Sequence, residues 1–201
     1  MVDVEDLVYT GIGARKAPEE ALRLARHIGY LMAKKGYTLR SGRAAGMDEA
    51  FEVGAIDYEI ETGECRREIW LPWNNFRDKE TTNSGFGFTQ DDVTVMRCGS
   101  VLEKAGVIDS FKALTAGVQR LFARNVYQVL GEYFKDGGPV PWTRVVIYWS
   151  EVTANGDCKG GTRIAVNLAK AMGIATYNLN IENERITVMR RLGIGLDYFY
   201  G

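Results

Sequence analysis

The sequence predicts an α/β fold in which helices flank an open parallel sheet, built as a single domain. Short apolar runs that favour strands alternate along the chain with runs whose apolar residues recur at helical spacing. The connections between these runs are short, which favours parallel strands joined by right-handed crossovers. The length of 201 residues suits one domain with a sizeable core.

In the first half of the chain we expect three strands and two helices. Residues 7–10, 37–40 and 68–72 are apolar and prone to strand formation, and the first two runs end at glycines. Amphipathic patterns predict a helix over 18–36, with proline at its start and glycine at its end, and another over 47–55. The order strand, glycine turn, helix therefore occurs twice in succession.

A polar, glycine-rich stretch from 73 to about 106 interrupts this pattern, and we expect a long irregular insertion there. The next strand, 144–149, is almost continuously apolar, as a central strand buried on both faces must be. The remaining elements that we expect are helices over 114–134, 164–172 and 183–192 and a strand over 175–179.

Charge and cysteine content exclude several classes of protein. The chain has 25 Lys and Arg against 26 Asp and Glu, so a nucleic-acid contact would need a local basic patch. Cys65, Cys98 and Cys158 are too scattered for a disulfide scaffold or a CxxC metal site. The first residues are acidic and no apolar run could cross a bilayer, so we expect a cytoplasmic protein with no membrane partner and no metal.

Three glycine turns follow predicted strands at 11–13, 41–46 and 160–162. Glycine lets a phosphate approach the backbone, and the helix start beyond each turn attracts anions. Because ligands of open parallel sheets bind beyond the carboxyl ends of the strands, the turns predict one phosphate-binding site. The alternative is that they only allow tight turns and close helix packing. The predicted binding residues are Gly11, Gly13, Ser41, Gly42, Gly46, Gly160, Gly161 and Thr162.

Cations stand beside these turns, and we add Arg15, Arg43 and Arg163 to the predicted anion site because a guanidinium binds phosphate through two hydrogen bonds. The usual nucleotide motifs are absent. The first turn has Lys16 where GxGxxG needs its last glycine, and GxxxxGK[ST] does not occur. We therefore expect neither a dinucleotide cofactor nor a P-loop.

Residues 11–15, 39–51 and 160–163 resemble the Rossmann-like SLOG superfamily, which contains the DNA-processing protein A (Smf) proteins and the LOG (lonely guy) nucleotide-processing enzymes. The resemblance covers roughly residues 7–180. Its most specific part is the S-G-x-A-x-G-x-D pattern that begins at residue 41, in which Arg43 replaces a glycine of the DNA-processing proteins.

Two further stretches refine the resemblance. LOG enzymes carry a catalytic glutamate where this chain has Ala165, so that residue is missing. The run 123–128 is similar to small, often virus-encoded proteins related to DNA-processing protein A, for which the host cytoplasm would be the location. Arg124 and Asn125 are polar residues in the middle of the predicted amphipathic helix, and we include them among the predicted ligand-binding residues. A solvated helix face explains Arg124 equally well.

The resemblance implies a nucleotide or nucleotide-derived ligand, with either N-glycosidic hydrolysis or transfer or binding alone. Cleavage would need a carboxylate to activate water or to stabilise charge on the sugar, and the candidates are Asp48, Glu49 and Glu52. An aspartate in a first helical turn is also an ordinary helix-starting residue.

Two other functions are compatible with the sequence. One is a single-stranded-DNA-binding recombination mediator, against which the neutral net charge argues. The other is a non-catalytic ligand sensor. Aromatic residues in 73–106 and the habit of the superfamily predict a homo-oligomer.

Overall fold

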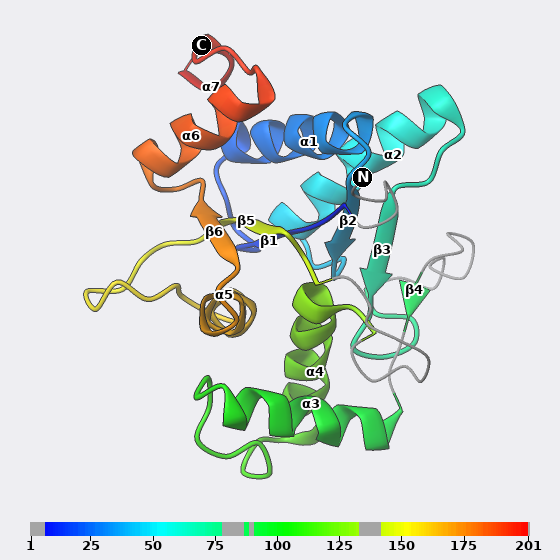
Figure 1. Cartoon of the computed structure of the whole chain (residues 1–201), viewed down its shortest axis with the longest axis vertical. Helices are drawn as coiled ribbons and strands as arrows, with labels where there is room; N and C mark the ends of the chain where they lie inside the picture. The colour runs from blue at the N-terminus through cyan, green and yellow to red at the C-terminus, as the bar shows by residue number, and fades with distance from the viewer. Residues whose placement is uncertain (1–6, 78–86, 89–90, 133–141, 201) are drawn as a thin grey trace.

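The computed structural model describes residues 7–77, 87–88, 91–132 and 142–200. At its centre lies a sheet whose strands have the order β4-β3-β2-β1-β5-β6, with every neighbouring pair parallel (Figure 1). The strands are β1 (Val8–Gly13), β2 (Thr38–Ser41), β3 (Arg67–Trp70), β4 (Gly87–Phe88), β5 (Val145–Trp149) and β6 (Ala175–Asn178). The prediction of an α/β fold with an open parallel sheet is confirmed.

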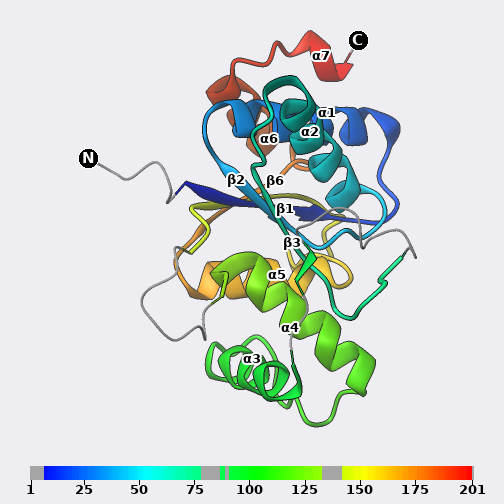
Figure 2. The same cartoon turned by 90° about the vertical axis from the view of Figure 1, so that its right-hand side faces the viewer.

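Helices cover both faces of this sheet. They are α1 (Glu19–Lys34), α2 (Met47–Thr62), α3 (Asp92–Lys104), α4 (Ala116–Leu130), α5 (Thr162–Ala171), α6 (Glu182–Leu192) and α7 (Asp197–Tyr200). In Figure 2, α1, α2 and α6 lie on one face and α4 and α5 on the other, with α3 packed on the outer side of α4. Among the described residues, no helix is long and apolar enough to span a membrane.

Two hydrophobic cores lie on the two faces of the sheet, because side chains alternate along each strand. On β5, Ile147 packs in the core under α1 and α2, whereas Val146 and Tyr148 pack in the core under α4 and α5. β5 pairs with β1 on one side and β6 on the other. The expectation of a central strand buried on both faces is confirmed.

The segment from 73 to 106 differs from the expected irregular insertion, because it contains α3 as well as the short β4. Asp91 caps α3 by accepting a hydrogen bond from the Thr94 amide at 2.7 Å. Val95, Cys98 and Leu102 form its buried face at helical spacing. The sequence contains this cap and this spacing, but the polar residues around them indicated a loop, so the helix was not predicted. Residues 78–86 and 89–90 lie outside the described part.

Candidate functional site

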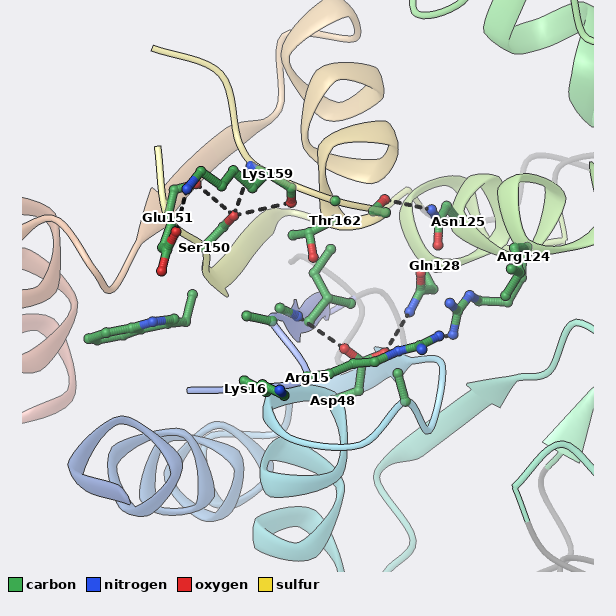
Figure 3. A pocket seen from close by; sticks show the side chains of 18 of the residues that line it. Arg15, Lys16, Asp48, Arg124, Asn125, Gln128, Ser150, Glu151, Lys159 and Thr162 are labelled. Carbon is green, nitrogen blue, oxygen red and sulfur yellow. Dashed lines mark hydrogen bonds and ion pairs between the residues drawn. The ribbon is translucent and has the colours of Figure 1, made fainter. Parts of the chain in front are cut away.

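A cavity of about 710 Å³ lies beyond the carboxyl ends of β1 and β5, between the residues before α1 and the helices α4 and α5 (Figure 3). The first and third glycine turns both contribute to its wall, as the parallel topology requires. The predicted site residues that line it are Gly13, Arg15, Asp48, Arg124, Asn125, Gly160, Gly161 and Thr162.

Asp48, in the first turn of α2, lies buried at the base of this cavity. Its Oδ1 accepts a hydrogen bond from the Gly13 amide at 3.0 Å, and its Oδ2 accepts one from Gln128 Nε2 at 3.5 Å. Oδ2 also lies 3.8 Å from Nη1 of Arg124. Burial raises the pKa of Asp48, while Arg124 and the backbone amides oppose that rise.

Arg124 is a buried cation in the middle of α4. Its Nη1 donates a hydrogen bond to the Gly42 carbonyl at 2.7 Å, so the second glycine turn positions it. A Cβ on Gly42 would lie 1.7 Å from that nitrogen, which explains the glycine. Burial lowers the pKa of Arg124, Asp48 raises it, and nearby Arg15 lowers it further. The buried Nε of Arg124 has no hydrogen-bond partner within the described structure.

Arg15 follows β1 and is exposed at the cavity. Figure 3 shows its side chain extending along the cavity toward Arg124, beside Asp48. Two guanidinium groups therefore lie near a single carboxylate, whose ion pair among the described residues is with Arg124. An anion placed between them would relieve their mutual repulsion and would meet Arg15 from the solvent side.

The first turn of α5 forms the opposite wall. Its N-cap, Gly161, provides no side-chain hydrogen bond, and the Arg163 and Ile164 amides donate to the Gly160 and Gly161 carbonyls at 3.3 and 3.2 Å. No carbonyl of the described residues accepts a hydrogen bond from the Thr162 amide, which leaves this amide for a ligand. Asn125 Nδ2 donates to the Gly161 carbonyl at 3.0 Å and thereby joins α4 to this turn. The site thus combines the N-terminus of α5 with two cations, Arg15 after the first glycine turn and Arg124 on α4.

A rim that sequence reasoning did not select closes the cavity beyond β5. Lys159 Nζ lies 2.5 Å from Glu151 Oε2, and this contact lowers the pKa of the exposed Glu151. The Lys159 amide donates to Ser150 Oγ at 3.2 Å, and Asn178 Nδ2 donates to the Ser150 carbonyl at 2.9 Å. The sequence feature that could have identified this rim is the position of Ser150 directly after a buried strand.

No protein-family profile matches the chain, and no curated protein is significantly similar to it. Among solved structures, it is similar to DNA processing protein A from Helicobacter pylori, described for its single-stranded DNA binding mode. The identity is 16%, the TM-score is 0.45, and the match covers 97% of this chain and 78% of that chain. Membership of the SLOG superfamily and a viral origin stay predictions.

Several predicted site residues do not line the cavity, and three of them are held in ion pairs. Arg43 pairs with Glu52, at 3.1 Å from its Nε, and Glu52 also lies 3.8 Å from Arg67. Glu49 accepts a hydrogen bond from Arg77 at 3.2 Å. None of these five side chains lines the cavity. Protein charges are thus paired with Arg43, Glu49 and Glu52, and a role for these residues in the site stays a prediction.

Other predicted residues support the cavity from behind. Ser41 Oγ donates to the Gly11 carbonyl at 2.7 Å and joins the ends of β1 and β2. Gly46 has φ of 83°, and a Cβ there would lie 2.5 Å from the Arg15 carbonyl oxygen, so the second turn packs directly on the first. Arg163 is exposed on α5 and does not line the cavity.

Proposed function

We propose that the cavity beyond β1 and β5 binds a nucleotide or nucleotide-derived ligand. The observation that carries this proposal is the charge at its base, where Arg15 and Arg124 face the single carboxylate of Asp48. A phosphate held by Arg15 and by the Thr162 amide at the start of α5 would complete the charge balance.

The wall formed by α4 suits the rest of such a ligand. Val118, Leu121 and Phe122 are partly exposed there and line the cavity. An aromatic ring offers a stacking surface for a base, and aliphatic neighbours exclude water around it. Gln128 and Asn180 add amide groups that can bind the polar edge of a sugar or base.

Asp48 acts in this proposal as a positioning residue. Both of its oxygens have protein partners, so it orients the Gly13 amide and Arg124. N-glycosidic hydrolysis or transfer stays a prediction, and release of free base during incubation with a nucleoside 5′-monophosphate is its test.

The binding experiment is calorimetric titration with nucleoside 5′-monophosphates and with the matching nucleosides. We expect saturable binding of the monophosphates, much weaker binding of the nucleosides, and a shallow dependence on salt. Lys170→Gln removes an exposed cation in the last turn of α5, which does not line the cavity, and is the matched control, with unchanged affinity expected. Equal affinity for nucleoside and monophosphate would contradict the proposed phosphate site.

A second candidate, single-stranded DNA, is favoured by the exposed Lys16 and Lys159 at the cavity and Arg163 beside it. Each phosphate neutralised in a single strand contributes about −0.7 to the slope of log affinity against log salt. Tight oligonucleotide binding with a slope steeper than about −3 would replace the mononucleotide proposal with this one.

A homo-oligomer also stays a proposal. Trp73, in the segment that prompted it, is 40% exposed, and Val93 and Met96 lie exposed on α3. The mass measured by light scattering at micromolar concentration tests this expectation, and a monomeric mass would contradict it.

A further inference from the structure

A second cavity, of about 290 Å³, lies near the amino ends of the strands, on the face covered by α1 and α6. Val145 and Ala175, the first residues of β5 and β6, line it together with Met32 of α1 and Leu192 of α6. None of its lining residues belongs to the nucleotide cavity. It is therefore a separate place in the fold, and a ligand bound there is independent of the proposed nucleotide function.

The rim of this second cavity is positively charged. Lys35, Arg144 and Arg191 line it, and none of the described residues around it is an aspartate or glutamate. Within the described part of the chain, no ion pair involves any of these three side chains. By contrast, Arg26 on the same helix α1 lies 2.6 Å from Asp57. The rim thus has cations without protein counter-charges among the described residues.

Two helices end at this cavity, and a helix C-terminus disfavours anions. Here the terminal carbonyls accept hydrogen bonds from the chain that follows them. The Tyr37 amide donates to Met32 at 3.0 Å at the end of α1, and the Ile194 amide donates to Met189 at 2.9 Å at the end of α6. Lys35 and Arg191 compensate the negative ends of the two helices. Arg144 precedes β5 and adds a positive charge that no helix end requires.

Beneath the cations, the cavity is apolar. Met32, Ile147 and Val188 line it and are 5%, 3% and 3% exposed. The Arg191 guanidinium lies 5.4 Å from the centroid of the Tyr177 ring, which holds this cation beside the apolar floor. A ligand that fits must therefore combine an apolar body with an anionic head.

We infer that the second cavity binds a small carboxylic acid with an apolar body. The carboxylate lies between Arg144 and Arg191, which can bind it through paired hydrogen bonds, and the body covers Met32, Ile147 and Val188. The described residues that line the cavity include no helix N-terminus and no side-chain amide, so it lacks the groups that favour a nucleotide. Its volume lies at the small end of the usual range for ligand cavities, roughly 300–1,000 Å³.

The test is titration of the full chain with octanoate, followed in amide NMR spectra, with octanol as the uncharged ligand of equal length. We expect shifts at Tyr37, Ala175 and Tyr177 and none at Gly13 or Gly161. The octanoate affinity should exceed that of octanol by about tenfold or more, the scale of one charge-assisted hydrogen bond. Equal affinities, shifts spread over the whole chain, or no binding of octanoate would overturn the inference.

Variants locate the carboxylate. Arg191→Gln and Arg144→Gln should each weaken octanoate by about fivefold or more. Arg190→Gln removes the neighbouring exposed cation of the same helix turn, which does not line the cavity, and should leave the affinity unchanged. Ala175→Phe fills the cavity from an exposed position and should abolish binding. An equal loss in Arg190→Gln and Arg191→Gln, or unchanged affinity in Ala175→Phe, would contradict the proposed site.

Discussion

Two arginine–carboxylate clusters lie near the glycine turns of this protein, and they differ in charge balance. The balanced cluster consists of Arg43, Glu52, Glu59 and Arg67 and contains two cations and two anions. The unbalanced cluster consists of Arg15, Asp48 and Arg124 and contains two cations and one anion. Among the described residues, the fold pairs Arg43 with a carboxylate but provides one carboxylate for Arg15 and Arg124, so we expect an anion site only at the unbalanced cluster.

The clusters also differ in what they connect. The balanced cluster joins the second turn to α2 and β3, which come after it along the chain. The unbalanced cluster joins α2 to α4, across the two faces of the sheet. Damage to the balanced cluster should reduce stability, and removal of the exposed cation of the unbalanced cluster should reduce ligand affinity. Substitutions in each cluster test this distinction.

The largest effect is expected for Glu52→Gln, which removes the carboxylate paired with Arg43 and leaves Arg67 paired with Glu59. Breaking a buried ion pair on one side costs about 3–5 kcal/mol in the free energy of unfolding. Chemical denaturation measures this loss. Glu64→Gln is the control, because its pair with Arg66 is exposed and worth roughly 1 kcal/mol or less. A similarly small loss of unfolding free energy in both variants would show that the balanced cluster does not stabilise the fold.

Arg15→Gln should have the converse effect. Arg15 is exposed, so its loss leaves the free energy of unfolding nearly unchanged. Loss of one charge-assisted hydrogen bond to phosphate costs about 1.5–3 kcal/mol, or about 10- to 100-fold in nucleoside monophosphate affinity. Calorimetric titration measures it. An affinity equal to that of the unchanged chain would show that the unbalanced charge binds no phosphate.

Gly42→Ala tests how the second turn positions Arg124. The added Cβ would displace the guanidinium, since it would lie 1.7 Å from Nη1. We expect a loss of about 1–3 kcal/mol in unfolding free energy, the scale of overpacking, together with weaker monophosphate binding. Gly117→Ala places the same methyl group on α4 with no atom within 4 Å, and it should not destabilise the protein. Equal behaviour of the two variants would contradict this account.

The smallest effect concerns pH. Because burial raises the pKa of Asp48, a fall in pH protonates this carboxylate in the folded protein before an ordinary aspartate and adds one positive charge to the unbalanced cluster. Sulfate, whose charge is constant above about pH 4, should bind more tightly as the pH falls through the raised pKa of Asp48. In Asp48→Asn the dependence should disappear, and its persistence there would assign it to another group.

The same raised pKa affects stability with a definite sign. The folded protein holds the Asp48 proton more tightly than the unfolded chain, so this residue contributes most to stability below its ordinary pKa of 3.8. The contribution is lost as pH rises through the higher, folded-state pKa. Denaturation curves of the unchanged chain and of Asp48→Asn, compared between about pH 4 and pH 7, measure this contribution.

Much of the fold could be predicted from local patterns. The apolar runs that became β1, β2, β3, β5 and β6, and the glycines between strand and helix, are properties of neighbouring residues. The sequence did not predict α3 for a local reason. Val93, Val95 and Val101 favour strands, and Gly99 has a low helix propensity. Packing of its buried face against α4 overrides those preferences.

By itself, the sequence determined that the glycine turns share one edge of a parallel sheet, because strand direction follows from the alternation of strands and helices. Only the tertiary structure decided which charges meet there. Asp48 interacts with Arg124 and Gln128, which lie on a helix far along the chain, whereas Arg43 pairs with Glu52 in the next helix. Backbone conformation depends on neighbours in the chain, whereas the partner of a long charged side chain depends on distant elements that pack beside it.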